Sequence, residues 1–317
     1  MNGVMKAITN ICTVHHHFLS QIEKLENVHP KESRIGGLFL QFAPQLKESH
    51  FEYCQFHSKF VHLIEQHKKE ICDLFSQSNV PQNIVSSCFN MQNSSSLNST
   101  NMNNTNVMIT SSLSITFRRL DNYPALLQEL QRYTDESHVD RGDTQRAGFL
   151  YREIAMSCLE LRRQKEMEIE VLLGNIRNFD GLKIETYGNI QKMEPVTILI
   201  LPPWTEPKKD CFLVLFDKVL MVLSVGHEMT SFSYESMLQI HNSSMPEIDF
   251  NQSFNEYQLE IQGYSAHPLS DSDLILTYII QFNNEDSWKE YYFILSKHIR
   301  IIHSPSTEQQ FVQSSSS

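Results

Sequence analysis

The chain of 317 residues has no long hydrophobic run, no paired cysteines and no glycine-rich nucleotide-binding motif. Its longest apolar runs, at 196–201 and 212–225, fall short of the ~18 residues that a membrane helix needs, and Asp217 and Lys218 interrupt the second. The six cysteines lie far apart without a C-x-x-C pair, which fits reduced thiols better than a disulfide framework or a zinc site. No P-loop and no G-x-S-x-G motif is present, and we find no secretory signal, so we expect a cytoplasmic protein without cofactor or metal.

Positive charge is also scarce, especially in the second half of the chain. The net charge is −11, and the part from Lys183 onward accounts for −9 of it, with 8 basic and 17 acidic residues. An acidic surface repels phosphate-rich partners. The charge distribution therefore excludes nucleic acid as a ligand and disfavours tight binding to anionic lipid.

The first half of the chain has helical periodicity. Apolar spacing predicts helices at about 1–25, 35–75, 113–136 and 140–178. The second of these contains Gly36, Gly37 and Pro44, so it is bent or made of two helices, and we attribute the two glycines to a bend. The Asn- and Ser-rich tract at about 77–112 buries too little apolar area to stay ordered, and we interpret it as a flexible loop.

The helix at 113–136 has two unlike faces. Its apolar stripe consists of Phe117, Leu120, Pro124, Leu127 and Leu130. Polar or small side chains occupy another side: Arg118, Asn122, Ala125 and Glu129. One face can build a core while the other meets a partner, although a solvated face is the common role of such residues. In the next helix Phe149 and Ile154 belong to the expected buried stripe.

The second half changes to short β-branched and aromatic segments separated by Pro, Asn, Ser and Gly. These predict strands at 196–201, 211–216, 218–224, 230–240, 257–262 and 274–282. A final amphipathic helix is expected at 286–302, where Trp288 and Tyr291 pack in a core. We therefore predict an α + β multidomain chain, with a helical bundle followed by a β-barrel that a C-terminal helix caps.

The segment RRLDNYPALLQEL at 118–130 resembles the region that exchange factors of the Dbl-homology type press against Rho GTPases, and the PIX/Cool (PAK-interacting exchange factor) family in particular. Residues 34–54 and 151–179 are similar to further signatures of that domain, and 186–196 resembles the first strand of a pleckstrin-homology module. The resemblance implies a Dbl-homology domain at 1–180 that begins after the family's first helix, a pleckstrin-homology domain at 183–304 and a disordered tail at 305–317.

The implied function is guanine nucleotide exchange on Rac- or Cdc-type Rho GTPases in cytoskeletal signalling, with recruitment to the cell periphery or adhesion sites. Such a factor is not an enzyme with a nucleophile, because it acts by binding the nucleotide-free GTPase best. The resemblance places GTPase contacts on Arg118, Asn122, Ala125, Leu126, Glu129, Leu159, Glu160 and Arg163. It also implies complexes with p21-activated kinase and GIT-type scaffolds, through segments that we do not find in this chain.

Together with the expected absence of the family's first helix, two substitutions in the family pattern favour an alternative. The family usually has a lysine or arginine where this chain has Asn122, and commonly a polar amide where it has Leu159. Leu159 could be a core residue or an exposed apolar contact. A catalytically weak or inactive scaffold that uses the same helical surface is therefore the second hypothesis.

Other candidate sites have simpler interpretations. His15, His16 and His17 point about 100° apart on a helix and cannot converge on one metal ion, so we expect surface residues. Arg119 is expected to pair inside the bundle. Around the first strand pair, Lys192, Lys208 and Lys209 are offset by neighbouring acidic residues, which predicts weak lipid contact at most.

Overall fold

The computed structural model describes residues 2–77, 101–201, 208–226, 231–240, 248–249, 257–266, 274–296 and 301–302. The chain forms two compact units, Met1–Met167 and Glu168–Ser317. The predicted domain limits at 180 and 183 stay predictions. Among the described residues, no helix combines the length and the apolar character that crossing a bilayer requires.

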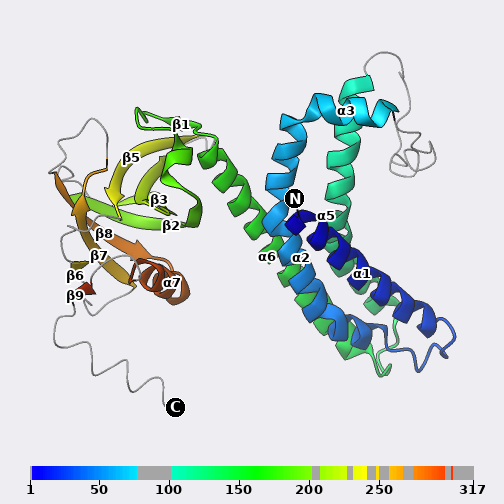
Figure 1. Cartoon of the computed structure of the whole chain (residues 1–317). Helices are drawn as coiled ribbons and strands as arrows, with labels where there is room; N and C mark the ends of the chain where they lie inside the picture. Colours follow the sequence, from blue (N-terminus) through cyan, green and yellow to red (C-terminus); the bar gives the residue numbers. More distant parts are fainter. Residues whose placement is uncertain are drawn as a thin grey trace. The chain divides into compact units, whose positions relative to one another are not determined.

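The first unit is a helical bundle (Figure 1). Its helices are α1 (Asn2–Leu25), α2 (Ile35–Gln66), α3 (Lys68–Gln77), α5 (Asn101–Tyr133) and α6 (Arg141–Leu172), of which α6 continues into the second unit. Apolar residues at helical spacing converge on one core, where Phe18, Phe39, Tyr123 and Tyr151 make edge-on ring contacts. The bundle predicted from the apolar periodicity is confirmed.

Asp140 joins the beginnings of α2 and α6. Its buried carboxylate accepts the Gly36 N–H at 2.6 Å and the Gly37 N–H at 2.9 Å, which are donors that an α-helix leaves without an internal partner in its first turn. A Cβ on Gly36 would lie 2.3 Å from the Thr144 backbone nitrogen, so only glycine allows this approach. The attribution of both glycines to a helix bend was wrong, because they form the capped first turn of α2.

The predicted block at 35–75 is indeed two helices, and the break falls at His67 rather than at Pro44, which lies inside α2. The predicted loop at 77–112 was wrong in part. Residues 78–100 lie outside the described residues, but 101–112 belong to α5. Extending an existing helix costs much less free energy than starting a new one. Because α3 also packs against α5, residues of low helix propensity at 101–112 can be helical as an extension of α5.

The second unit contains a seven-stranded sheet in the order β1-β5-β4-β3-β2-β8-β7. The strands are β1 (Ile176–Arg177), β2 (Ile190–Leu201), β3 (Lys209–Phe216), β4 (Val219–Val225), β5 (Phe232–Gln239), β7 (Gln258–Tyr264) and β8 (Ile275–Phe282). All neighbours are antiparallel except β1 and β5, and β6 (Ile248–Asp249) pairs separately with β9 (Ile301–Ile302). A 3₁₀ turn at Ile184–Tyr187 precedes β2.

The predicted barrel was wrong, because the described strands do not close. Among the described residues, the edges of β5 and β7 meet through the bridge between Leu238 and Ser265 and the bond from Ala266 N–H to the Met237 carbonyl at 2.9 Å. Closure requires a continuous ladder along both edges. The start of that edge of β5 is already paired with β1, so the described sheet curls without closing.

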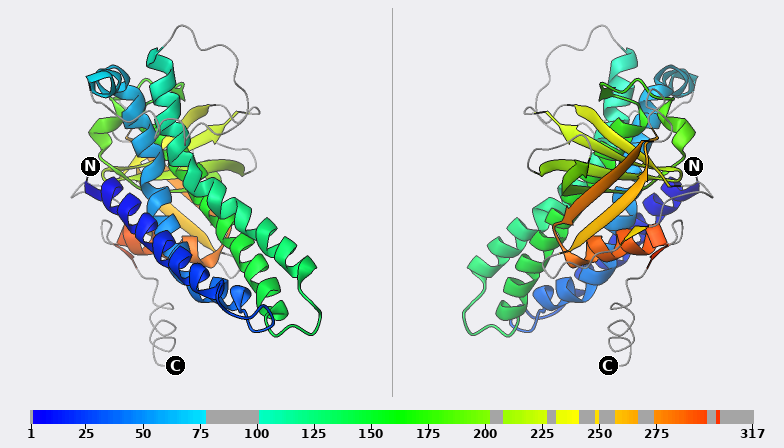
Figure 2. Two further views of the ribbon diagram at one scale, coloured as in Figure 1. Left: turned by 90° about the vertical axis from the view of Figure 1, so that its right-hand side faces the viewer. Right: turned by 90° about the vertical axis from the view of Figure 1, so that its left-hand side faces the viewer.

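Helix α7 (Glu285–Ser296) packs at one end of the sheet (Figure 2). Asn284 caps it by accepting the Ser287 N–H at 2.8 Å. The predicted core roles of Trp288 and Tyr291 are confirmed: Tyr291 is fully buried and donates to the Leu213 carbonyl at 2.7 Å, and the Trp288 indole donates to the Gln258 carbonyl at 3.1 Å. The helix ends earlier than predicted, and Ile301–Ile302 is a strand.

Candidate functional site

Helices α5 and α6 lie antiparallel and together form the candidate surface. The Arg141 guanidinium donates to the Gln131 carbonyl at 2.9 Å where the two helices join. Further along, a Cβ on Gly148 would lie 3.9 Å from the Leu127 Cβ, and the Arg162 guanidinium lies 4.7 Å from the centre of the Phe117 ring. The contacts pair early residues of α6 with late residues of α5, so one side of this helix pair is a single continuous surface.

All five predicted contact residues on α5 are exposed: Arg118, Asn122, Ala125, Leu126 and Glu129. Leu126 has 59% of its surface exposed although it is a large apolar residue. The opposite stripe behaves as the periodicity predicts, since Phe117, Leu120 and Leu127 are buried. Sequence reasoning missed Tyr123, which is also buried there.

On α6 the predicted residues Leu159, Glu160 and Arg163 are exposed as well. Leu159, left open between core and surface, is 37% exposed and belongs to the surface. The expectation that Phe149 is buried was wrong, because it is 58% exposed. It lies two residues before the buried Tyr151, and two helical residues point about 200° apart.

Two charged residues of this surface make exposed interactions within α5. The Arg118 guanidinium donates to the Ser111 carbonyl at 3.2 Å, and Glu129 pairs with Arg132 at 2.5 Å. Exposed ion pairs of this kind contribute at most about 1 kcal/mol, so an incoming partner can replace them at low cost. Arg119 behaves as expected, donating to the Tyr123 hydroxyl at 3.2 Å within the bundle.

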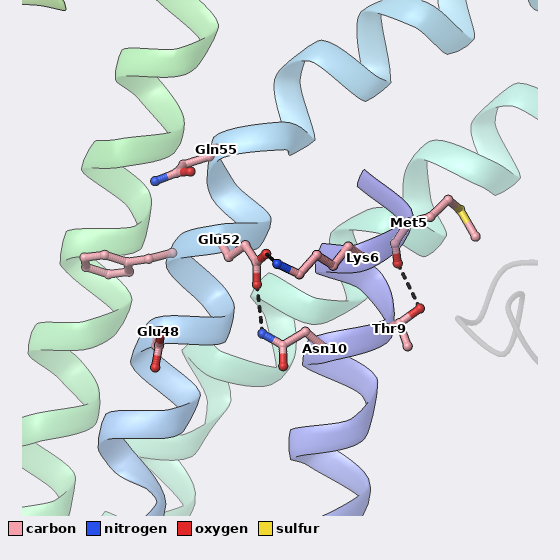
Figure 3. A pocket seen from close by; sticks show the side chains of 8 residues that line it. Met5, Lys6, Thr9, Asn10, Glu48, Glu52 and Gln55 are labelled. Carbon is pink, nitrogen blue, oxygen red and sulfur yellow. Dashed lines mark hydrogen bonds and ion pairs between the residues drawn. The ribbon is translucent and has the colours of Figure 1, made fainter. Parts of the chain in front are cut away.

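A shallow groove of about 810 Å³ lies between α1 and α2 (Figure 3). Three of its polar side chains interact with one another, since Glu52 accepts from Asn10 at 2.8 Å and lies 3.9 Å from the Lys6 ammonium. None of the predicted contact residues lines it. In the part of the chain that the structure describes, no cluster of three or more His, Cys, Asp or Glu could hold a metal ion.

Three histidines lie behind the candidate surface, where sequence reasoning did not place them. His15 was expected on the surface, but it is half-buried, with its Nδ1 3.3 Å from the Tyr123 hydroxyl and its ring 5.2 Å from that of His50. The ring of His57 lies 4.8 Å from that of Phe117. The prediction failed because the register of α1 on α2 turns His15 inward, which the run of three histidines does not reveal.

Burial makes these histidines hard to protonate. It is the main cause that lowers the pKa of His15 to about 4, with His50 and Arg119 adding to it, and it likewise lowers the pKa of His57 to about 4, helped by Arg162. Burial also lowers the pKa of His50. Both ring nitrogens of His57 are buried without a partner in the structure. The folded bundle therefore holds neutral imidazoles against the inner side of α5.

The bundle should lose stability in mild acid. A histidine whose pKa is lowered on folding takes up its proton first in the unfolded chain. The free energy of unfolding is therefore highest above about pH 6.5 and decreases as the pH drops towards 4. Within this range, each such histidine can lower the free energy of unfolding by up to about 1.4 kcal/mol for each pH unit that the pH falls. Urea unfolding at pH 7 and pH 5 should show a lower free energy of unfolding at pH 5.

Replacing His57 with phenylalanine should shrink that difference, while replacing the exposed His16 with glutamine should leave it unchanged. Equal free energies of unfolding at the two pH values would contradict the buried neutral state.

The three lysines predicted to contact lipid do not act together. Lys192 pairs with Glu194 at 3.3 Å and with Glu290, and its ammonium lies 5.7 Å from the centre of the Tyr291 ring. Lys208 and Lys209 are exposed at the start of β3. A lysine engaged by two carboxylates presents little net charge to a membrane. Weak lipid contact through Lys208 and Lys209 stays a prediction.

Comparison with known proteins identifies the family of the helical unit. The RhoGEF domain family matches residues 1–158. Human Rho guanine nucleotide exchange factor 7 is 26% identical over 298 residues, which are 94% of this chain and 33% of that protein; human Rho guanine nucleotide exchange factor 6 is 25% identical over 92% of this chain and 33% of its own length. The solved complex of the PDZ-RhoGEF DH/PH domains with activated RhoA aligns with a TM-score of 0.43 at 14% identity, covering 92% of this chain and 80% of that one.

The chain thus spans about a third of the length of the human relatives that it matches. The matched segment contains α1, α2, α3, α5 and α6 up to Cys158, and so includes the whole exposed face of α5. Residues 1–158 therefore form a RhoGEF domain, and the PIX-type Rho guanine nucleotide exchange factors 6 and 7 are homologues of the chain.

Proposed function

We propose that this chain binds Rho-family GTPases through the exposed side of α5 and α6 and promotes the release of GDP. The observation that carries the proposal is that all eight contact residues expected from the family pattern are exposed on these two adjoining helices, five of them inside the matched RhoGEF segment and three directly after it. A set chosen only by sequence position would be expected to include buried residues, because both helices bury a full face.

The mechanism needs no catalytic side chain. Nucleotide exchange follows if the surface binds the nucleotide-free GTPase more tightly than the GDP-bound form, because that difference in affinity drives GDP out. Arg118 and Glu129 can offer charges of opposite sign to such a partner. Leu126 and Leu159 offer apolar area that loses contact with water on binding.

The family resemblance is the ground for proposing a Rac- or Cdc-type GTPase as the partner, and with it a role in cytoskeletal signalling in the cytoplasm and at the cell periphery. Complexes with p21-activated kinase and GIT-type proteins stay predictions from the resemblance.

A scaffold without exchange activity is the second candidate, because the two residues that differ from the family pattern lie exposed on the candidate surface. Asn122 carries no charge and Leu159 cannot form hydrogen bonds, and both lie on the surface where a partner would meet them. Such a surface can still bind a GTPase through apolar contact and the remaining charges while distinguishing poorly between its nucleotide states.

Binding to one GTPase in different nucleotide states separates the two functions. The purified chain would be immobilised and exposed to nucleotide-free, GDP-bound and GTPγS-bound forms of Rac- and Cdc-type GTPases. An exchange factor should bind the nucleotide-free form at least about a hundred-fold more tightly than the others. Equal affinity for all three forms would support the scaffold, and absence of binding by the folded chain would contradict both.

A further inference from the structure

We infer that Phe149 and Met156 extend the GTPase-binding surface along α6, as an apolar strip that the family pattern does not assign. The inference rests on the proposed function, since it names further contact residues of the same surface. It differs from it in placing contacts in the first half of α6, before Leu159, Glu160 and Arg163.

Helical periodicity places the two residues on the face that already holds predicted contacts. Met156 lies seven residues after Phe149, and Glu160 and Arg163 follow at intervals of four and three. Residues at these intervals share one side of an α-helix. The four side chains therefore form one exposed stripe along α6, opposite the buried side that contains Tyr151 and Cys158.

The exposure of this stripe is unusual for its composition. Phe149 and Met156 each have 58% of their surface exposed, although α6 buries other apolar residues well. The guanidinium of Arg152 lies 5.9 Å from the centre of the Phe149 ring, so a positive charge borders the apolar strip. Exposed aromatic and methionine side chains with an arginine at the edge are the composition that protein interfaces favour.

The packing of α5 against α6 brings this strip level with the contact residues of α5. The contact between Arg162 and Phe117 sets one level, and the contact between Gly148 and Leu127 sets another, earlier along α6 and later along α5. Because the helices are antiparallel, the span of α6 that contains Phe149 and Met156 lies alongside 118–126 of α5. A GTPase that covers Arg118, Asn122 and Ala125 is therefore next to the strip.

With this strip, the interface with the GTPase is expected to have apolar contacts at its centre and charged contacts around them. Replacing Met156 with glutamate would place a charge where the partner buries apolar area, and replacing Phe149 with alanine would remove the area without adding charge. Neither side chain supports the core, so both changes should leave the fold intact.

The test measures the affinity of the full chain for a nucleotide-free Rac-type GTPase, together with its melting temperature and its oligomeric state. Met156→Glu should weaken binding at least about ten-fold and Phe149→Ala about five-fold, with unchanged melting temperatures. Two matched controls are Met5→Glu on α1, where Met5 is 57% exposed, and Phe293→Ala on α7, where Phe293 is 61% exposed. Both controls should bind as the wild type does.

Unchanged affinity of Met156→Glu and Phe149→Ala, in an assay where charge reversal of Arg118 and Glu129 abolishes binding, would overturn this inference and leave the proposed function standing. Loss of self-association by Met156→Glu with unchanged GTPase affinity would also overturn it, because a second copy would then be the occupant. No binding by the folded wild-type chain would overturn the inference and the proposed function together.

Discussion

Replacing Asp140 with alanine should lower the free energy of unfolding of the helical unit by about 3–5 kcal/mol, because one buried and one partly buried N–H group of α2 lose a charged acceptor. Asp140 also precedes α6 directly, and its carbonyl accepts the Thr144 N–H at 2.9 Å, so the same residue fixes the beginnings of two helices. Urea unfolding of the full chain at pH 7, followed by the helical signal in circular dichroism, would measure the change.

Two further variants distinguish the loss of the hydrogen bonds that cap α2 from the loss of a negative charge alone. Asp140→Asn keeps one acceptor oxygen but turns an amide N–H₂ towards a backbone donor, so it should fall between wild type and alanine. Asp135→Ala, in the exposed turn before α6, removes the bonds to Ser137 and should cost much less than Asp140→Ala. A loss from Asp140→Ala as small as that from Asp135→Ala would contradict the role of Asp140.

Reversing the charge of both Arg118 and Glu129 should weaken GTPase binding at least about a hundred-fold, because each would meet a like charge on a surface complementary to the wild type. Both side chains are exposed, and Glu129 pairs with Arg132 on the same helix, so the melting temperature should not fall. Titration of nucleotide-free Rac- or Cdc-type GTPase with the double variant Arg118→Glu, Glu129→Lys would measure this.

The matched control carries the same change of charge on another helix. Glu23→Lys with Lys24→Glu alters two exposed residues of α1 and should bind as the wild type does. Unchanged binding by the α5 variant, or a fall in its melting temperature that accounts for the loss, would show that these side chains are not the contacts.

Periodicity predicted the two-faced character of α5 because its apolar residues recur at helical spacing. A residue two positions from a buried one, such as Asn122 or Arg118, then falls on the exposed side. The strands of the second unit were predictable in the same way from their β-branched and aromatic content. The identity of the contact residues came from the family resemblance and not from the spacing.

Long-range geometry could not be predicted in this way. Asp140 caps a helix that begins more than a hundred residues earlier, and nothing near Asp140 in the sequence indicates which donors it accepts. The inward turn of His15 depends on the register of α1 against α2, and the open sheet depends on β1 occupying an edge of β5. These features arise from how elements pack together, and local spacing does not encode packing between distant elements.

The rate of GDP release tests the central claim most directly. Rac- and Cdc-type GTPases loaded with fluorescent GDP would be mixed with excess unlabelled nucleotide, with the wild-type chain and with the Arg118→Glu, Glu129→Lys variant. The account predicts faster release with the wild type, rising with its concentration, and no acceleration by the variant. Release at the intrinsic rate with a folded wild-type chain would contradict exchange activity.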